Sequence, residues 1–383
     1  KTDADAYRKK LRGERGTKVT ITYLRNAATK QAVITRDAIP LVSVDASYMM
    51  TKEIGYIRLN KFSSVTYREF MEALEPLKKA GLQKLILDLR GNGGGILDQA
   101  VEIADEFLDG DKLITYTEGK HVDKKEYRCR RNGQFETGKL VVLADEGSAS
   151  ASEILIGALQ DWDRATIVGR RSFGKGLVQE QFDLSDKSAL RLTIARYYTP
   201  IGRSIQRPYT NGERAYYDEV SNRYHDPETT YADSVKNNSG KAYKTKGGKT
   251  VYAKGGIAPD YFIAMDTSGF SKNSAAIYNK STISSFAYNF YLQNQALIKT
   301  FKSPADFIKG FSLSDENWKQ FTDAAAKDSI NISIVSAKEK SSLSNQIRSS
   351  IARQIWRNEG YFEVINTTDE GIKKALEIIE TNK

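Results

Sequence analysis

Two short, predominantly apolar runs constrain the fold of this chain, because a small-residue turn and a helical pattern follow each of them. Residues 84–89 and 140–144 have the pattern of buried strands. Residues 97–107 and 153–162 follow them, with apolar side chains at helical spacing. Strands and helices in alternation favour a largely parallel sheet with crossover helices. The sequence therefore predicts an α/β core.

The turn after the second run carries a candidate nucleophile, Ser150. Backbone N–H groups at the start of a helix have no intrahelical partner and lie at the positive end of the helix dipole. A hydroxyl there can attack a carbonyl whose developing oxyanion meets those donors. Ser150 and Glu153 also fit a capping box, which is the commoner explanation of an arbitrary Ser-x-x-Glu pattern. The nucleophile hypothesis therefore depends on a base.

A serine nucleophile needs a group that takes its proton. The chain has two histidines, His121 and His225, both in polar segments, so a Ser-His-Asp triad stays open as an alternative. A lysine can serve instead where desolvation favours the neutral amine. Lys175 is the candidate, because two glycines flank it in a predicted turn between strands, although solvated turn lysines are common.

At these residues the chain resembles a known family, the carboxyl-terminal processing proteases, also called tail-specific proteases. The matching blocks span about residues 6 to 265 in order, and they are 87–95, 147–153, Phe173-Gly174-Lys175-Gly176 with Gln179, 197–206 and 255–260. The resemblance implies Ser150 as the nucleophile, Lys175 as the base and Gln179 as the residue that orients the lysine. It also implies a crotonase-like core joined to a PDZ domain.

The glycine loop at residues 91–95 is the second expected part of the site. A dinucleotide-binding fingerprint fails there, because position 96 is isoleucine where a third glycine is required. Glycine lets backbone N–H groups approach a substrate oxygen, although most such loops are plain turns. The resemblance implies one oxyanion donor from Gly94 or Gly95 and a second from Ala151.

Asp161 is eleven residues beyond Ser150, on the same helical face. At about 1.5 Å per residue it lies roughly 16 Å along the helix axis, too far for direct contact. We expect a structural residue that ends the helix or pairs with Arg164. Upstream, Thr66 and Glu69 predict a capping box for another helix.

The chain divides by composition into three predicted parts. Residues 1–38 form a helix and a following strand that look like the last third of a PDZ domain. Residues 39–270 form the protease core, with a polar surface insertion at 209–254 that contains a hairpin around 243–252. Residues 271–383 are mostly helical, with apolar stripes that are more typical of a core than of a dimer contact.

Composition argues against a nucleic-acid-binding protein, a membrane-spanning protein and a metal-dependent enzyme. The net charge of +10 has both signs interspersed, which argues for a solvated surface and against a nucleic-acid site. A single cysteine, Cys129, allows no intrachain disulfide, and no apolar run is long enough to span a membrane. No cluster of ligands has metal-site spacing, so neither a metal nor a cofactor is predicted.

The sequence predicts a serine endopeptidase with a Ser-Lys pair that cleaves protein or peptide substrates near their C-termini through an acyl-enzyme. The alternatives are a catalytically silent peptide-binding scaffold of the same fold and an amidase acting on small amides. The chain begins with Lys1, which suggests a fragment or a processed chain. Relatives of the family act in the bacterial cell envelope, so we expect an exported, periplasmic protein with a signal or lipid anchor upstream. The apolar stripes of the C-terminal helices leave a homodimer through these helices as the minority interpretation.

Overall fold

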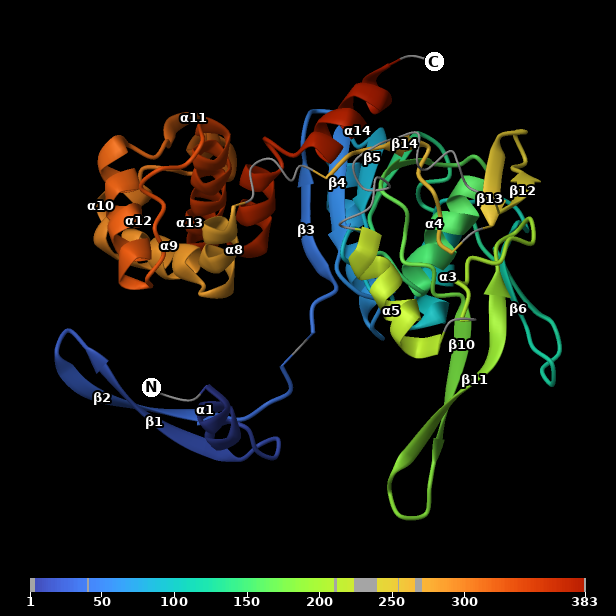
Figure 1. The fold of residues 1–383 in the computed structure, drawn as a ribbon, viewed down its shortest axis with the longest axis horizontal. Helices are drawn as coiled ribbons and strands as arrows, with labels where there is room; N and C mark the ends of the chain where they lie inside the picture. Colours follow the sequence, from blue (N-terminus) through green and yellow to red (C-terminus); the bar gives the residue numbers. More distant parts are fainter. Residues whose placement is uncertain are drawn as a thin grey trace. The chain divides into compact units, whose positions relative to one another are not determined.

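The structure is a computed structural model that describes residues 4–39, 41–209, 212–223, 240–253, 255–265 and 271–381 (Figure 1). Its internal contacts divide the chain into two compact units, Lys1–Val42 and Ser43–Lys383. None of the described helices is both long and apolar enough to cross a membrane.

The first unit is one helix and one hairpin. Helix α1 (Ala4–Leu11) precedes the antiparallel strands β1 (Lys18–Arg25) and β2 (Ala28–Thr35). The Arg36 guanidinium donates to backbone carbonyls of Lys10 and Leu11, which ties the helix to the hairpin. The predicted helix and first strand are confirmed, and β2 is an addition that the sequence analysis did not contain.

The second unit is built on a six-stranded sheet with the order β14-β9-β8-β5-β4-β3. All neighbouring pairs are parallel except β3 with β4, so the predicted parallel-rich sheet is confirmed. The strands are β3 (Val44–Met49), β4 (Ile54–Leu59), β5 (Lys84–Asp88), β8 (Lys139–Ala144), β9 (Thr166–Gly169) and β14 (Tyr261–Phe262). The two apolar runs of the sequence analysis are β5 and β8, which pair in register.

Helices cover both faces of this sheet. Three of them pack on one face with alternate strand residues such as Leu85, Leu87 and Val142: α2 (Thr66–Lys79), α3 (Leu97–Asp105) and α4 (Ala151–Asp161). The opposite face carries Ile86 and Val141 and is covered by α14 (Glu370–Glu380) (Figure 1). Burial on both faces explains why the central residues of β5 and β8 are apolar on both faces.

The predicted capping box at Thr66 is wrong. Val65 is the N-cap residue of α2 and gives no side-chain cap, while Thr66 lies inside the helix. The Thr66 hydroxyl accepts the Ser63 N–H at 2.7 Å. The Glu69 carboxylate accepts the Ser43 N–H at 2.6 Å, so it holds the segment that leads into β3 and is not available to the helix start.

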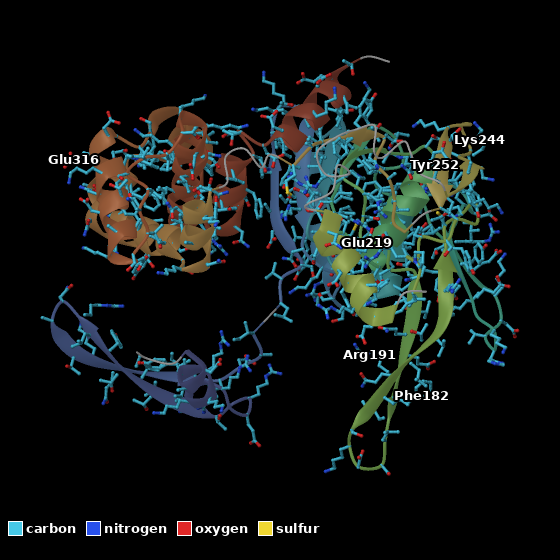
Figure 2. All side chains as sticks on the ribbon, in the orientation of Figure 1. Phe182, Arg191, Glu219, Lys244, Tyr252 and Glu316 are labelled. Carbon is cyan, nitrogen blue, oxygen red and sulfur yellow. The ribbon has the colours of Figure 1, made fainter. Side chains whose placement is uncertain are left out.

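A second, antiparallel sheet carries the strands that follow the predicted lysine turn. Its order is β10-β11-β6-β7, with the strands β6 (Leu113–Glu118), β7 (Lys125–Arg128), β10 (Leu177–Asp183) and β11 (Ala189–Tyr198). The β10–β11 hairpin extends away from the main sheet with exposed side chains at 179–193 (Figure 2, where Phe182 and Arg191 mark it).

The described part of the polar insertion contains a helix and a hairpin. The hairpin pairs β12 (Lys241–Lys244) with β13 (Thr250–Ala253), which confirms the predicted one. Helix α5 (Gly212–Arg223) was not predicted, and it is anchored because its Glu219 carboxylate pairs with the buried guanidinium groups of Arg171, Arg207 and Arg223.

The C-terminal region is mostly helical, as expected. Its helices are α8 (Lys272–Asn279), α9 (Thr282–Gln293), α10 (Gln295–Ile298), α11 (Pro304–Gly310), α12 (Asp315–Lys327) and α13 (Ala337–Ile365). The apolar stripes of α9 and α13 bury Phe286, Phe290 and Ile347 in one core. Helix α13 is kinked at Trp356 and Arg357, beyond which its last residues pack beside β3.

The burial of α14 generates a stability prediction. Ile379 is 0% exposed on the outer face of the sheet, whereas Ile334 is 94% exposed. We expect Ile379→Ala to lower the free energy of unfolding by about 2–5 kcal/mol, because it opens a cavity. Ile334→Ala is the matched control and should change it by less than about 0.5 kcal/mol. Equal losses in urea unfolding would contradict the docking of α14.

Candidate active site

Ser150 is the N-cap residue of α4, in the turn that leaves β8. Its backbone angles are φ 57° and ψ −114°, a conformation that residues with a side chain seldom adopt. Such a backbone costs on the order of 1–3 kcal/mol and persists only where its surroundings hold it. The turn therefore stores strain at the one serine that the sequence analysis selected.

Hydrogen bonding distinguishes the three serines of this turn. The Ser148 hydroxyl donates to the Leu89 carbonyl at 2.8 Å, and the Ser152 hydroxyl donates to the Asn92 carbonyl at 2.8 Å. Both side chains are fully buried, whereas Ser150 is partly exposed. Ser150 is therefore the member of the three that can reach a substrate.

A buried carboxylate, Glu153, joins the Ser150 turn to the lysine turn. It accepts the Ser150 N–H at 2.9 Å, and the expected capping box of Ser150 and Glu153 is present. It also accepts the Gly174 N–H at 2.7 Å, the Lys175 N–H at 2.8 Å and the Ser172 hydroxyl at 2.5 Å. Burial raises the pKa of Glu153, and these four donors oppose that rise. The capping interpretation therefore accounts for only one of the four hydrogen bonds that the Glu153 carboxylate accepts, and the other three come from the lysine turn.

Lys175 and Gln179 line the same cleft as Ser150. The cleft has a volume of about 530 Å³, and Ile96, Leu97, Ile154 and Leu177 give it an apolar wall. A β-bulge between Val178 and Gln179 alters the pleat of β10 where it passes the site. Among the described residues, no hydrogen bond or ion pair involves the Lys175 amine or the Gln179 amide. The amine thus has no carboxylate partner that would favour its charged form.

The glycine loop lies directly against the Ser150 turn. A Cβ on Gly94, whose φ is +89°, would lie 2.7 Å from the Ser150 Cβ, so only glycine allows this approach. The Gly94 N–H donates to the Asn92 side-chain oxygen at 2.9 Å. In the described part of the chain, the N–H groups of Gly95 and Ala151 have no acceptor, and both residues line the cleft.

Tyr197 completes the floor of the site. Its hydroxyl donates to the Lys175 carbonyl and forms a side-chain hydrogen bond with Ser150. Because a phenol has one proton to donate, the Ser150 hydroxyl is the donor to Tyr197. Burial, together with the charge of Glu153, raises the pKa of Tyr197 well above its usual value, so it stays a neutral phenol.

The other candidates of the sequence analysis lie outside the cleft. His121 is exposed beyond β6, and His225 lies outside the described residues. Asp161 is the last residue of α4, but its partner is the buried Arg203 and not Arg164. Arg164 instead donates to the backbone carbonyls of Phe107 and Phe135. Within the described ranges, no group of three His, Cys, Asp or Glu side chains could hold a metal ion.

Residues 53–212, which hold all these site residues, match the model of peptidase family S41. This part of the chain is therefore similar to an S41 peptidase domain. Residues 274–357 match a second model, a family of unknown function (DUF8443).

Curated relatives agree with the S41 assignment. The chain is 41% identical over 202 residues to a carboxy-terminal-processing protease of Bartonella bacilliformis, covering 51% of this chain and 46% of the relative. It is 40% identical over 205 residues to a carboxyl-terminal-processing protease of Synechocystis, covering 52% and 47%. The chain thus spans about half the length of these relatives. A solved photosystem II D1 C-terminal processing protease matches at 34% identity and a TM-score of 0.40, over 51% of this chain and 54% of that one.

Sequence reasoning did not identify three residues that position the S41 site: Glu153 as a link between turns, Tyr197 and Asn92. Each lies inside a block that was quoted for its resemblance. An acid three residues after the serine was a usable signal for Glu153. Tyr197 and Asn92 carry no such signal, because their partners are backbone groups from distant segments.

The strained turn of the S41 domain predicts an unequal effect of two substitutions at Ser150. Ser150→Gly should be more stable than Ser150→Ala by about 1 kcal/mol, because glycine adopts a positive φ without penalty and alanine does not. Thermal and urea unfolding of the two variants compare them directly, and both lack the hydroxyl. An alanine variant that is as stable as the glycine variant would mean that the turn relaxes.

Proposed function

We propose that this chain is a serine endopeptidase in which Ser150 is the nucleophile and Lys175 is the general base. The observation that carries the proposal is the cleft-facing Ser150 hydroxyl, the one of three neighbouring serine hydroxyls that donates to no backbone carbonyl in the described chain. It lies at a helix start beside two N–H groups without an acceptor in the described chain, Gly95 and Ala151.

The proposed reaction begins when Ser150 Oγ attacks the scissile carbonyl and its proton passes to the Lys175 amine. The N–H groups of Ala151 and Gly95 stabilise the oxyanion of the tetrahedral intermediate. Gly94 shapes the loop that presents Gly95, because its own N–H is held by Asn92. Lys175 then protonates the leaving amine. In deacylation it takes a proton from the water that attacks the acyl-enzyme, and it returns this proton to Ser150 Oγ as the acyl–oxygen bond breaks and the carboxylic acid product leaves.

In the free protein, Ser150 and Lys175 share the cleft, but no hydrogen bond joins their side chains in the described residues. Such contacts are often long before substrate binds and tighten in the productive complex. The Ser150 hydroxyl would exchange its bond to Tyr197 for one to Lys175. Gln179 lies in β10, the strand that follows the Lys175 turn. Its neutral amide would orient the lysine amine without favouring the ammonium form as a carboxylate would.

Polypeptide C-termini are the substrates that we propose, because the curated relatives are named for carboxyl-terminal processing. We further propose three domain assignments: a crotonase-like core at 39–270, a PDZ-like segment at 1–38 and a separate helical domain at 271–383. We also propose that the protein is exported and acts in the cell envelope. A homodimer through the C-terminal helices stays a prediction. No cofactor is part of the proposed reaction.

The test of this proposal is covalent labelling with a fluorophosphonate, followed by peptide mapping. We expect the label on Ser150, and Ser150→Ala should abolish both labelling and peptide cleavage while the fold is retained. His121→Gln is the matched control and should keep wild-type activity, as should the chain after chelator treatment. A folded chain that neither takes the label nor cleaves any C-terminal peptide would favour the silent scaffold.

Substitutions of the base predict a graded series. Lys175→Ala and Lys175→Arg should both lose several orders of magnitude in kcat, because an arginine is not deprotonated in this pH range. Gln179→Ala should lose less, since it removes an orienting amide and keeps the base. Steady-state kinetics on one C-terminal peptide measure all three. An arginine variant that still cleaves would mean that another group takes the serine proton.

A further inference from the structure

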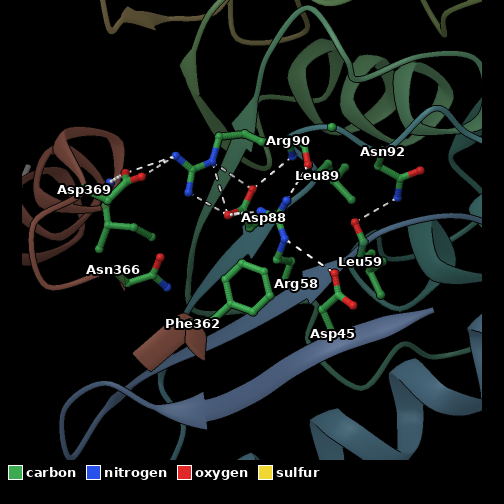
Figure 3. A network of polar contacts seen from close by, with 12 residues as sticks. Asp45, Arg58, Leu59, Asp88, Leu89, Arg90, Asn92, Phe362, Asn366 and Asp369 are labelled. Carbon is green, nitrogen blue, oxygen red and sulfur yellow. Dashed lines mark hydrogen bonds and ion pairs between the residues drawn. The ribbon is translucent and has the colours of Figure 1, made fainter. Parts of the chain in front are cut away.

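The C-terminal helix α14 contacts the arginine that precedes the glycine loop. Nη1 of Arg90 lies 3.0 Å and 2.9 Å from the two carboxylate oxygens of Asp369, 279 residues away in the chain (Figure 3). The same carboxylate accepts the Ile372 N–H at 2.8 Å and is the N-cap of α14. One side chain therefore both starts the helix and binds Arg90.

Asp88 holds Arg90 from the other side. The fully buried Asp88 carboxylate accepts from Arg90 Nη2 at 2.7 Å, from Arg58 Nη1 at 2.7 Å and from the Tyr56 hydroxyl at 2.8 Å. Burial by itself would raise the pKa of Asp88, but the two guanidinium groups outweigh it and hold this pKa well below its usual range. Three carboxylates, those of Asp45, Asp88 and Asp369, pair with the two guanidinium groups, so removal of Asp369 leaves Arg90 with only the Asp88 carboxylate, which it shares with Arg58, among the described residues.

A second C-terminal contact braces the same arginine pair. Arg58 Nη2 donates to the Arg90 carbonyl at 2.9 Å, and the Arg58 guanidinium lies 4.7 Å from the ring centre of Phe362 in α13 (Figure 3). The chain beyond the kink of α13 thus contacts Arg90 directly through Asp369, and indirectly because Phe362 packs on Arg58. The position of the Arg90 backbone depends on both.

The backbone after Arg90 leads straight into the proposed oxyanion site. The Gly91 N–H donates to the Asp145 carboxylate at 2.8 Å. The Asn92 carbonyl accepts the Ala149 N–H at 3.0 Å and the Ser152 hydroxyl at 2.8 Å, on either side of Ser150. A shift of the Arg90 backbone would therefore move the Gly94–Gly95 peptide relative to the nucleophile.

We infer that Asp369 is a positioning residue for the S41 site, through which α14 holds the Arg90–Gly95 loop in its productive geometry. This inference rests on the proposed peptidase function for its effect on turnover. The contact itself is a property of the fold. Misplacement of an oxyanion donor lowers kcat more than substrate binding, because the donor acts on charge that develops in the transition state.

The kinetic test uses two substitutions that keep the helix cap. Ser and Asn are good N-cap residues, so Asp369→Ser and Asp369→Asn should both preserve α14. Serine is too short to reach Arg90, and we expect its kcat to fall about tenfold, with KM changed less than about twofold. Asparagine keeps one acceptor without the charge and should lie between serine and the wild type.

Asp323→Asn is the matched control, because it breaks the exposed ion pair with Lys319 in α12, where the two groups are 3.0 Å apart. Its kcat should equal that of the wild type. Equal kcat in the wild type and in both Asp369 variants would overturn the positioning role, and so would a rise in KM without a loss of kcat.

Hydrogen exchange separates this inference from the proposed function. In the Ser150→Ala background, Asp369→Asn should speed amide exchange in residues 89–95 while β8 and α14 keep their protection. That result would support the coupling even if the chain cleaved no peptide, which would overturn the peptidase proposal alone. Unchanged exchange in 89–95 would overturn the inference even in an active peptidase.

Discussion

The geometry of the site depends on one buried carboxylate, that of Glu153. It accepts two backbone N–H groups from the Gly174–Lys175 turn and one from Ser150, and burial would otherwise disfavour its charge. Without it, these donors would be left unpaired in the interior, at a cost of about 1–3 kcal/mol each. Glu153 thereby joins the segments of the proposed nucleophile and base, and it also sustains the strained backbone of Ser150.

Sheet topology supplies the rest of the arrangement. Because β5 and β8 are adjacent and parallel, the glycine loop and the serine turn leave the sheet at the same edge. Crossed hydrogen bonds then join the two turns: Ser148 donates to Leu89, and Ser152 and Ala149 donate to Asn92. The hydroxyls of Ser148 and Ser152 are engaged in these hydrogen bonds, whereas Ser150, which lies between them, faces the cleft.

The spacing of apolar residues and glycines along the chain predicted those strands, helices and turns that depend on nearby residues. Short, predominantly apolar runs identified β5 and β8, because a strand that is buried on both faces carries apolar side chains on both. Helical spacing identified α4, and a glycine-bounded hairpin identified β12 and β13. The pattern failed at Thr66, where a capping box was expected, because Glu69 accepts the backbone N–H of Ser43, 26 residues earlier, in the segment that leads into β3. It also missed α5, whose polar sequence is held by ion pairs with distant arginines.

The sequence by itself determined strands β5 and β8, helix α4 and the residue types of the candidate site, since these depend on spacing along the chain. It also singled out Ser150, Lys175 and the glycine loop. Only the tertiary structure decided which loop glycine keeps an N–H without an acceptor in the described chain, which serine hydroxyl is not held by a backbone carbonyl, and which partner Asp161 takes. It alone brought Asp369 to Arg90. Hydrogen bonds and ion pairs between distant segments depend on how the chain packs, and no local pattern records that.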